Sequence, residues 1–156
     1  MKLELKDTNS SDLDTLFSFQ LDKEANYLAA FTSKDPTDKD AFLKKWTMIL
    51  SEPTINCKTI YVDGEIAGSI TKYVMEGDAE ITYWIGKNFW GKGIASKALQ
   101  EFLNIEKTRP LFGRVAFDNF GSQKVLEKSH FSKIGTETGF ATAREEEITE
   151  FVYKLS

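Results

Sequence analysis

This chain of 156 residues is poor in the residue types on which several classes of protein depend. Its single cysteine, Cys57, and single histidine, His130, allow no internal disulfide and are too few for a zinc site. No apolar run is long enough to span a membrane, and the first ten residues lack the apolar core of a signal peptide. We therefore expect no bound metal and a reducing, cytoplasmic location.

Positive charge is also in short supply. Acidic residues outnumber basic ones by 24 to 20, the net charge is −4, and the isoelectric point is near 5.1. Nucleic-acid-binding domains usually present a basic face, so this balance argues against a nucleic-acid partner. An acidic protein attracts cationic ligands instead.

Apolar residues make up 41% of the chain, and twelve of them are phenylalanine, which is enough for one bulky core. The length predicts one domain over residues 1–156. The predicted order is a strand, two helices, three meandering strands, a helix, a strand, a helix and two strands. This order indicates an α+β domain of the α/β type, built on a mixed sheet.

Local signals place several boundaries. Ser11 is predicted to cap the first helix and Thr37 the second, whereas residues 26–36 read as an irregular connection. Asp63 and Gly64 stand between two β-rich runs and predict a hairpin turn. We found no repeat, low-complexity tract or linker.

The stretch YWIGKNFWGKGIASKALQEFL carries the strongest functional signal. An aromatic strand leads through Gly86, Gly91 and Gly93 directly into an amphipathic helix at residues 94–106. The first N–H groups of a helix have no partners within it, and the helix dipole adds positive charge at the same end. Glycines let a ligand approach this backbone closely, so the stretch predicts a site for a phosphate or pyrophosphate.

Several ligands could use such a site. A nucleoside triphosphate loop matches at Gly86, Gly91 and Lys92, but Gly93 stands where a Ser or Thr must bind Mg²⁺. A dinucleotide loop would need a third glycine at Ser96 and a position at the start of a βαβ unit. A strand-to-helix turn that binds no ligand also remains open. Coenzyme A is the third candidate ligand.

Three segments resemble the GNAT superfamily of N-acetyltransferases, and most closely its ribosomal-protein N-acetyltransferase branch. WGKGIASKAL resembles the acetyl-CoA pyrophosphate loop, with Trp90 departing from the usual first residue. VAFDNFGSQKVLEKSHF resembles a later segment of that branch, with His130 in place of glycine. AEITYWI resembles the strand before the loop and carries Glu80 at its acidic position.

The resemblance implies a GNAT-like fold, with a central, mostly antiparallel twisted sheet of about seven strands flanked by about four helices. It implies acetyl-CoA as co-substrate, with pantetheine lying in a strand splay and bonding to the backbone near Trp84 and Ile85. The pyrophosphate would sit on the N–H groups of Gly91 to Ser96 in the glycine loop. The expected cofactor-binding residues are Trp84, Ile85, Trp90, Gly91, Lys92, Gly93, Ile94, Ala95, Ser96 and Asn119. Asn119 could instead only cap its helix.

The implied reaction is acetyl transfer to a primary amine, either a small molecule or a protein N-terminus. Glu80 is the candidate base and Ser122 the hydroxyl expected near the sulfur. Leu126 stands where many relatives have a Tyr that protonates the leaving thiolate, so the general acid is left open. The alternative is a non-catalytic acyl-CoA-binding module on the same fold. The sequence also leaves a homodimer open.

Overall fold

Seven β-strands form a single mixed sheet in the structure, a computed structural model that describes residues 1–156. The strands are β1 (Leu3–Asp7), β2 (Asn56–Val62), β3 (Glu65–Met75), β4 (Asp78–Ile85), β5 (Leu111–Ala116), β6 (Ser132–Ala141) and β7 (Glu146–Leu155). They lie in the order β1-β2-β3-β4-β5-β7-β6, and only β4 and β5 pair in parallel. The expected sheet of about seven mostly antiparallel strands is confirmed.

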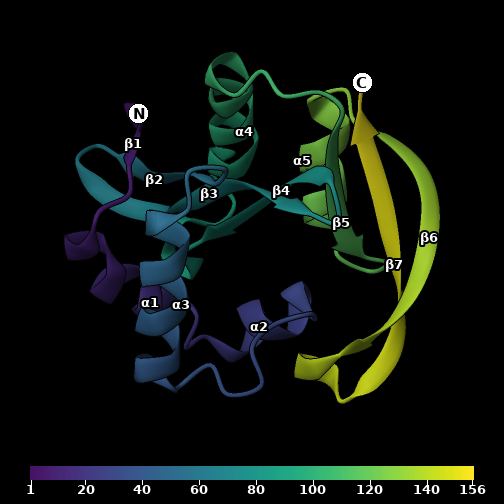
Figure 1. The fold of residues 1–156 in the computed structure, drawn as a ribbon, viewed down its shortest axis with the longest axis horizontal. Helices are drawn as coiled ribbons and strands as arrows, with labels where there is room; N and C mark the ends of the chain where they lie inside the picture. Colours follow the sequence, from purple (N-terminus) through teal and green to yellow (C-terminus); the bar gives the residue numbers. More distant parts are fainter.

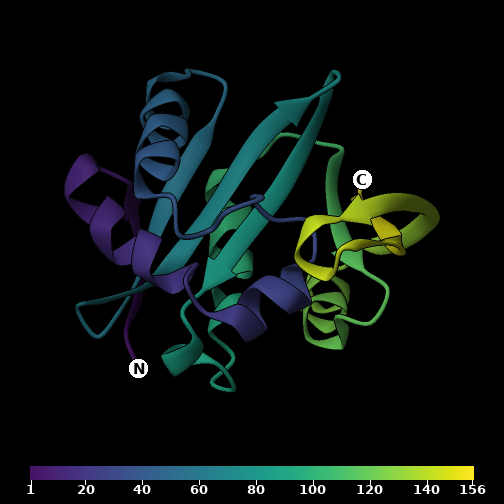
Figure 2. The same ribbon diagram turned by 90° about the horizontal axis from the view of Figure 1, so that it is seen from below.

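Five α-helices cover the two faces of this sheet (Figures 1 and 2). They are α1 (Leu13–Phe19), α2 (Lys23–Ala29), α3 (Lys39–Ser51), α4 (Ile94–Ile105) and α5 (Phe120–Lys128). Helices α4 and α5 lie on one face, and α1, α2 and α3 lie on the other (Figure 1). None of the helices is both long and apolar enough to cross a membrane.

The main core lies between the sheet and helix α4. Four residues of α4 at helical spacing are almost fully buried: Ile94, Ala98, Leu99 and Phe102. They pack against strand residues such as Ile60 and Ile70, as the periodicity of the sequence predicted. Ile105, which has the same spacing, is exposed at the last residue of the helix. A smaller cluster, with Leu13, Leu16 and Phe42 at its centre, packs α1 against α3.

The expected caps of the first two helices are wrong. Asn9, not Ser11, caps the first helical turn, because its side chain accepts from Ser11 N–H while Asp12 closes a capping box. Asp38, not Thr37, caps α3 by accepting from the N–H of Ala41 at 3.0 Å. In both cases a stronger carboxylate or amide acceptor stands within two residues of the hydroxyl.

Helix α2 was not expected, and it raises the number of helices from about four to five. Its N-cap is Asp22, whose carboxylate accepts from the N–H of Ala25 at 2.8 Å. The helix has only seven residues and ends at Ala30, which adopts a φ of 66°. A helix this short carries almost no periodic signal, and its stability comes from its contacts with β5 and the β6–β7 end.

The hairpin at Asp63 and Gly64 is confirmed. Both residues have positive φ, 50° and 83°, which is the backbone of the turn that joins twisted antiparallel strands most tightly.

Strands β4 and β5 separate early, and this separation positions the functional site. Only Ala79–Ile81 of β4 pair with Leu111–Gly113 of β5, and both strands continue beyond that point. The structure therefore has the splay that the resemblance implies. The second half of β4 faces β3 on one side and the splay on the other.

Candidate functional site

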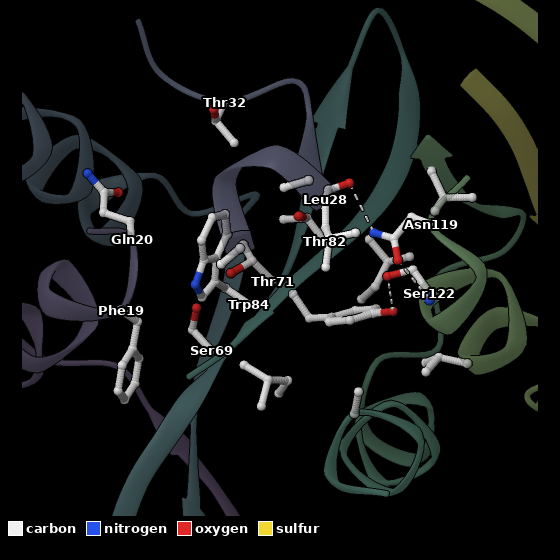
Figure 3. Close-up of a pocket in the computed structure, with 18 of the residues that line it drawn as sticks. Phe19, Gln20, Leu28, Thr32, Ser69, Thr71, Thr82, Trp84, Asn119 and Ser122 are labelled. Carbon is white, nitrogen blue, oxygen red and sulfur yellow. Dashed lines mark hydrogen bonds between the residues drawn. The ribbon is translucent and has the colours of Figure 1, made fainter. Parts of the chain in front are cut away.

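A cavity of about 1110 Å³ opens at the splay and extends to both faces of the sheet. On one side it is lined by the glycine loop and the first turn of α5, and on the other by α2, α3 and the strands. Figure 3 shows Ser69, Thr71, Thr82 and Trp84 together on the strand side, with Asn119 and Ser122 of α5 opposite. Of the twelve site residues expected from the sequence, all but Lys92 line this cavity. Lys92 is exposed and lies over the Phe89 ring.

The glycine loop has the backbone geometry of an anion site. Gly91 and Gly93 adopt left-handed conformations, with φ of 76° and 73°. Gly93 is the N-cap of α4 and has no side chain with which to cap it. The N–H groups of Ile94, Ala95 and the following residue therefore lack the side-chain acceptor that most helix starts have. An anion can take that place, favoured by the positive end of the helix dipole.

Trp90 fastens this loop to the sheet. Its indole Nε1 donates a hydrogen bond of 2.8 Å to the carbonyl of Ile85, the last residue of β4. Trp90 stands where the family usually has another residue type, and here its side chain holds the loop in place.

The backbone of β4 alternates between β3 and the splay. The N–H of Gly86 bonds to Ala67 of β3, so Trp84 and Thr82 also turn their backbone groups toward β3. Tyr83 and Ile85 turn theirs toward the splay, where β5 no longer pairs. Of the two residues expected to bond pantetheine through their backbone, Ile85 faces the splay and Trp84 does not. Trp84 instead contributes its indole, whose N–H is buried without a partner.

Glu80 lies at the base of the splay on the same strand face as Thr82 and Trp84. The residue is only 2% exposed, and both carboxylate oxygens accept from Arg114 Nε, at 3.1 and 3.2 Å. Burial raises the pKa of Glu80, and the charge and hydrogen bond of Arg114 oppose that rise. Arg114 was not foreseen, because parallel pairing of distant segments leaves no local signal.

Asn119 caps α5, as the sequence allowed. Its Oδ1 accepts from the N–H of Ser122 at 3.3 Å, and its Nδ2 donates to the carbonyl of Leu28 at 3.2 Å. Both bonds are drawn in Figure 3. The side chain thus ties α5 to the end of α2 across the cavity.

Ser122 meets a residue that the sequence did not single out. The Tyr83 hydroxyl donates to Ser122 Oγ at 3.0 Å, and burial raises the pKa of Tyr83 to about 12. Leu126, at the position of the expected tyrosine, is 3% exposed and packs in the core.

The single cysteine and the single histidine lie away from this site. Cys57 is part-buried beside Thr8 and Thr71, and burial raises the pKa of its thiol, which disfavours a nucleophile. His130 is exposed in the turn after α5, with a φ of 71°. Neither residue lines the cavity.

Comparison with known proteins agrees with this geometry. The family model for the acetyltransferase (GNAT) domain matches residues 2–132. The chain belongs to the GNAT acetyltransferase family. An uncharacterized N-acetyltransferase, p20, from Bacillus licheniformis is 32% identical over 83 residues, which are 51% of this chain. The match takes in 47% of the length of p20, so this GNAT chain matches about half of that protein.

Solved structures show the same GNAT fold. An N-acetyltransferase from Staphylococcus aureus Mu50 superposes with a TM-score of 0.85 over 100% of this chain and 99% of its own, at 19% identity. RimL, a ribosomal L7/L12 alpha-N-protein acetyltransferase in complex with coenzyme A, gives a TM-score of 0.76 at 18% identity. That superposition covers 97% of this chain and 93% of RimL.

Proposed function

We propose that this protein transfers an acetyl group from acetyl-CoA to a primary amine. The observation that carries the proposal is the continuity of the cavity. It runs from the uncapped start of α4, along the free edge of β4, to a buried carboxylate at the base of the splay. Acetyl-CoA, a long and flexible molecule with a pyrophosphate in one part and a thioester at one end, fits such a path. RimL, which shares the fold, was solved with coenzyme A.

The residues present suit the parts of acetyl-CoA. The N–H groups from Gly91 to Ser96 would hold the pyrophosphate. The backbone of Tyr83 and the N–H of Ile85, whose carbonyl already accepts from Trp90, would offer hydrogen-bond partners for the amides of pantetheine, and Asn119 lines the same passage. When bound, the thioester supplies an activated acetyl group.

Glu80 would act as the base, and Ser122 would stabilise the leaving group. As the amine nitrogen bonds to the acetyl carbon, Glu80 accepts the displaced proton, through a water because its side chain is almost fully buried. The carbon–sulfur bond breaks, its electrons stay on sulfur, and Ser122 donates a hydrogen bond to that sulfur. The thiolate then takes a proton from solvent, and Glu80 returns its proton to solvent.

The acceptor would be a primary amine that enters from the side of α2 and α3. Three carboxylates surround Arg114 and leave net negative charge there: Glu80, Glu137 and Glu150. Such a field attracts a protonated amine. At pH 7, deprotonation costs about 1–1.5 kcal/mol for an α-amino group and about 4–5 kcal/mol for a lysine-like amine. A peptide N-terminus or a small amine of low pKa therefore demands least of the base.

Calorimetry with acetyl-CoA and two charge variants tests the co-substrate site. Ser96→Glu places a carboxylate in the first turn of α4, where it suits the helix but repels a pyrophosphate. Gln100→Glu adds the same charge one turn later, at an exposed position outside the cavity, and serves as the matched control. We expect saturable binding that Ser96→Glu weakens about tenfold or more and Gln100→Glu leaves nearly unchanged.

A panel of primary amines and N-terminal peptides, incubated with acetyl-CoA and followed by thiol release, tests the transfer itself. Acetylation of at least one amine by the wild-type protein supports the proposal. Binding with no transfer to any amine would support the acyl-CoA-binding module instead. A well-folded protein that does not bind acetyl-CoA would overturn both.

A further inference from the structure

We propose that Tyr83 is a positioning residue, whose hydroxyl holds Ser122 so that the serine proton faces the departing sulfur. The inference rests on the proposed acetyl transfer and adds a residue to it. It is carried by one hydrogen bond, from the Tyr83 hydroxyl to Ser122 Oγ at 3.0 Å, which crosses the splay from β4 to α5.

The two residues come from opposite walls of the cavity. Tyr83 lies two residues beyond Ile81, the last residue of β4 that pairs with β5, and its side chain packs on the side of α4 and α5. Ser122 lies in the first turn of α5, where its N–H bonds to the cap Asn119. Both side chains line the cavity. The bond therefore sits where the passage for the thioester meets the start of α5.

The chemistry of the two hydroxyls sets the direction of the bond. A phenol is more acidic than an aliphatic alcohol, so Tyr83 is the better donor and Ser122 the better acceptor. Burial raises the pKa of Tyr83 to about 12, so the phenol keeps its proton throughout the neutral range. Ser122 donates to no group of the chain, which leaves its own proton free to point into the cavity.

This arrangement matters because the helix offers no other donor at that place. Leu126, one turn further along α5, is buried against Gly113 and carries no polar atom. A serine hydroxyl rotates freely unless its oxygen is engaged, and each orientation competes with the productive one. With Tyr83 occupying a lone pair of Oγ, Ser122 is already oriented before the carbon–sulfur bond breaks.

Tyr83 acts in the step only by orienting Ser122, and its proton stays on the phenol. The electrons of the carbon–sulfur bond go to sulfur, Ser122 donates a hydrogen bond to the resulting thiolate, and solvent supplies the proton. Loss of Tyr83 would leave Ser122 present but unoriented.

The test uses Tyr83→Phe, Ser122→Ala and the double variant. The matched control is Tyr153→Phe, which removes another buried phenol whose hydroxyl also bonds to α5, at Glu127 Oε2, 3.0 Å away. Burial raises the pKa of Tyr153 to about 12 as well, but Tyr153 lies outside the cavity. Thermal unfolding of each variant shows whether the fold is kept.

Two readouts separate positioning from a structural role. The first is kcat with the fastest amine of the panel, measured beside the Kd of acetyl-CoA. The second needs no amine: the pKa of the thiol of bound CoA, followed through the ultraviolet absorbance of its thiolate. A cysteine thiol in a model peptide has a pKa of about 8.5. A hydrogen bond from Ser122 should lower the pKa of the CoA thiol in the complex below that of free CoA.

We expect Tyr83→Phe to lower kcat about tenfold with little change in the Kd of acetyl-CoA. It should also raise the pKa of the bound thiol, and it should change neither quantity further when Ser122 is already alanine. Tyr153→Phe should leave both at wild-type values. An equal effect of Tyr83→Phe with and without Ser122, or an unchanged thiol pKa, would overturn the inference. If the wild type acetylates no amine, the proposed function fails while the thiol titration still decides the role of Tyr83.

Discussion

Arg114 and Glu80 face each other at the point where β4 and β5 begin to part. Arg114 directly follows Gly113, the last residue of β5 that pairs with β4, and its Nε reaches both oxygens of Glu80. Its Nη1 meanwhile contacts the carboxylates of Glu137 and Glu150 from β6 and β7. The ion pair therefore fixes the orientation of Glu80 and joins it to the second half of the sheet.

Glu80→Gln should separate catalysis from co-substrate binding. We expect kcat to fall about a hundredfold or more, because an amide cannot take a proton, while the Kd of acetyl-CoA stays nearly unchanged. In the wild type, activity should rise with pH through the raised pKa of Glu80, since only the ionised carboxylate is a base. Glu137→Gln is the control, because it removes another carboxylate that pairs with Arg114 but that lies outside the cavity. Equal losses in both variants would show that charge around Arg114 matters rather than the base.

Arg144→Lys should destabilise the wall of the cavity formed by α2. Arg144 makes two hydrogen bonds of 2.7 Å to Asp118 and donates from Nε to the carbonyl of Tyr27 at 2.9 Å. Its side chain is only 2% exposed, and a lysine cannot reproduce this planar fork. We expect a loss of about 1–3 kcal/mol in unfolding free energy, measured by urea titration at pH 7.

The same bonds lower the pKa of Asp118, so the stability that they provide is present above the unfolded pKa. That stability is lost as pH falls through the lower folded value. The difference between Arg144→Lys and wild type should therefore shrink in strong acid, and a constant difference would contradict this account.

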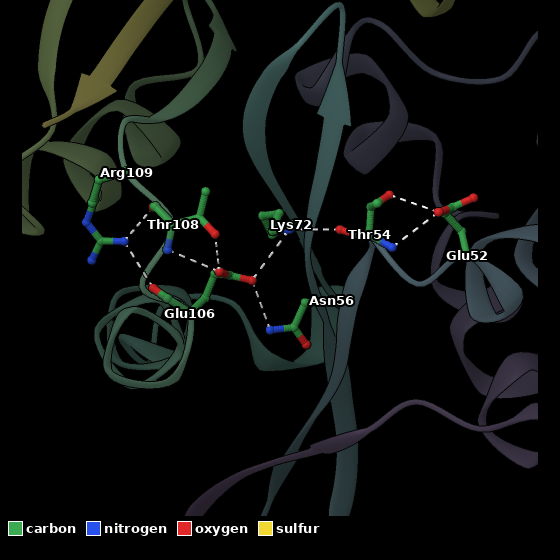
Figure 4. A network of polar contacts seen from close by, with 7 residues as sticks. All are labelled: Glu52, Thr54, Asn56, Lys72, Glu106, Thr108 and Arg109. Atoms are coloured by element: carbon green, nitrogen blue, oxygen red, sulfur yellow. Dashed lines mark hydrogen bonds and ion pairs between the residues drawn. The ribbon is translucent and has the colours of Figure 1, made fainter.

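Glu106→Gln should destabilise the end of α4 that lies away from the glycine loop. Glu106 accepts from Asn56 Nδ2 and from the N–H and hydroxyl of Thr108, and it lies 3.9 Å from Lys72 Nζ (Figure 4). Burial alone would raise the pKa of Glu106, but these hydrogen bonds and the Lys72 charge lower it overall. We expect a cost of about 1–3 kcal/mol at pH 7, measured by thermal unfolding.

The sign of the pH dependence follows from that lowered pKa. The contribution of Glu106 is present above its unfolded pKa and is lost as pH falls through the lower folded value. Wild type and Glu106→Gln should converge in acid. A gap that persists there would assign the effect to packing rather than to the charge.

His130→Gly should stabilise the protein. His130 adopts a φ of 71° after α5, and the N–H of Phe131 bonds back to the carbonyl of Leu126. A helix end with this left-handed conformation favours glycine. Glycine is the usual residue at this position in the segment that the chain resembles. We expect a gain of about 0.5–1 kcal/mol, since relief of backbone strain exceeds the added entropy of the unfolded chain. His130→Ala is the control and should give no gain.

The fold could largely be predicted because strong local signals agreed with one another. The Asp63–Gly64 turn and the apolar face of α4 specify their elements with a few neighbouring residues. Helix α2 could not be predicted, because its seven residues hold together through contacts with β5 and the β6–β7 end. The displaced caps have a similar cause, since Asp38 and Thr37 are both good caps and only the folded turn selects one.

The candidate site was predicted where a motif is continuous in sequence. Glu80, Ser122 and the residues of the glycine loop other than Lys92 line one cavity. Tyr83 and Arg114 were missed, because each contacts its partner, Ser122 or Glu80, across more than thirty positions of the chain. Only the register of β4 against β3 and β5 shows which backbone groups face the splay. The sequence alone could therefore not show that the Trp84 backbone, expected to bond pantetheine, faces β3 instead.

The short joint between β4 and β5 has a consequence for the mechanics of the domain. Three residue pairs connect the two halves of the sheet there, whereas β3 and β4 share eight and β5 and β7 share six. Bending motions of the sheet should therefore concentrate between β4 and β5. The Glu80–Arg114 ion pair is a further contact that holds the two halves together there. A ligand bound in the splay would contact both halves of the sheet at once. Its binding should stiffen the whole molecule, so that regions far from the ligand exchange their amide hydrogens more slowly.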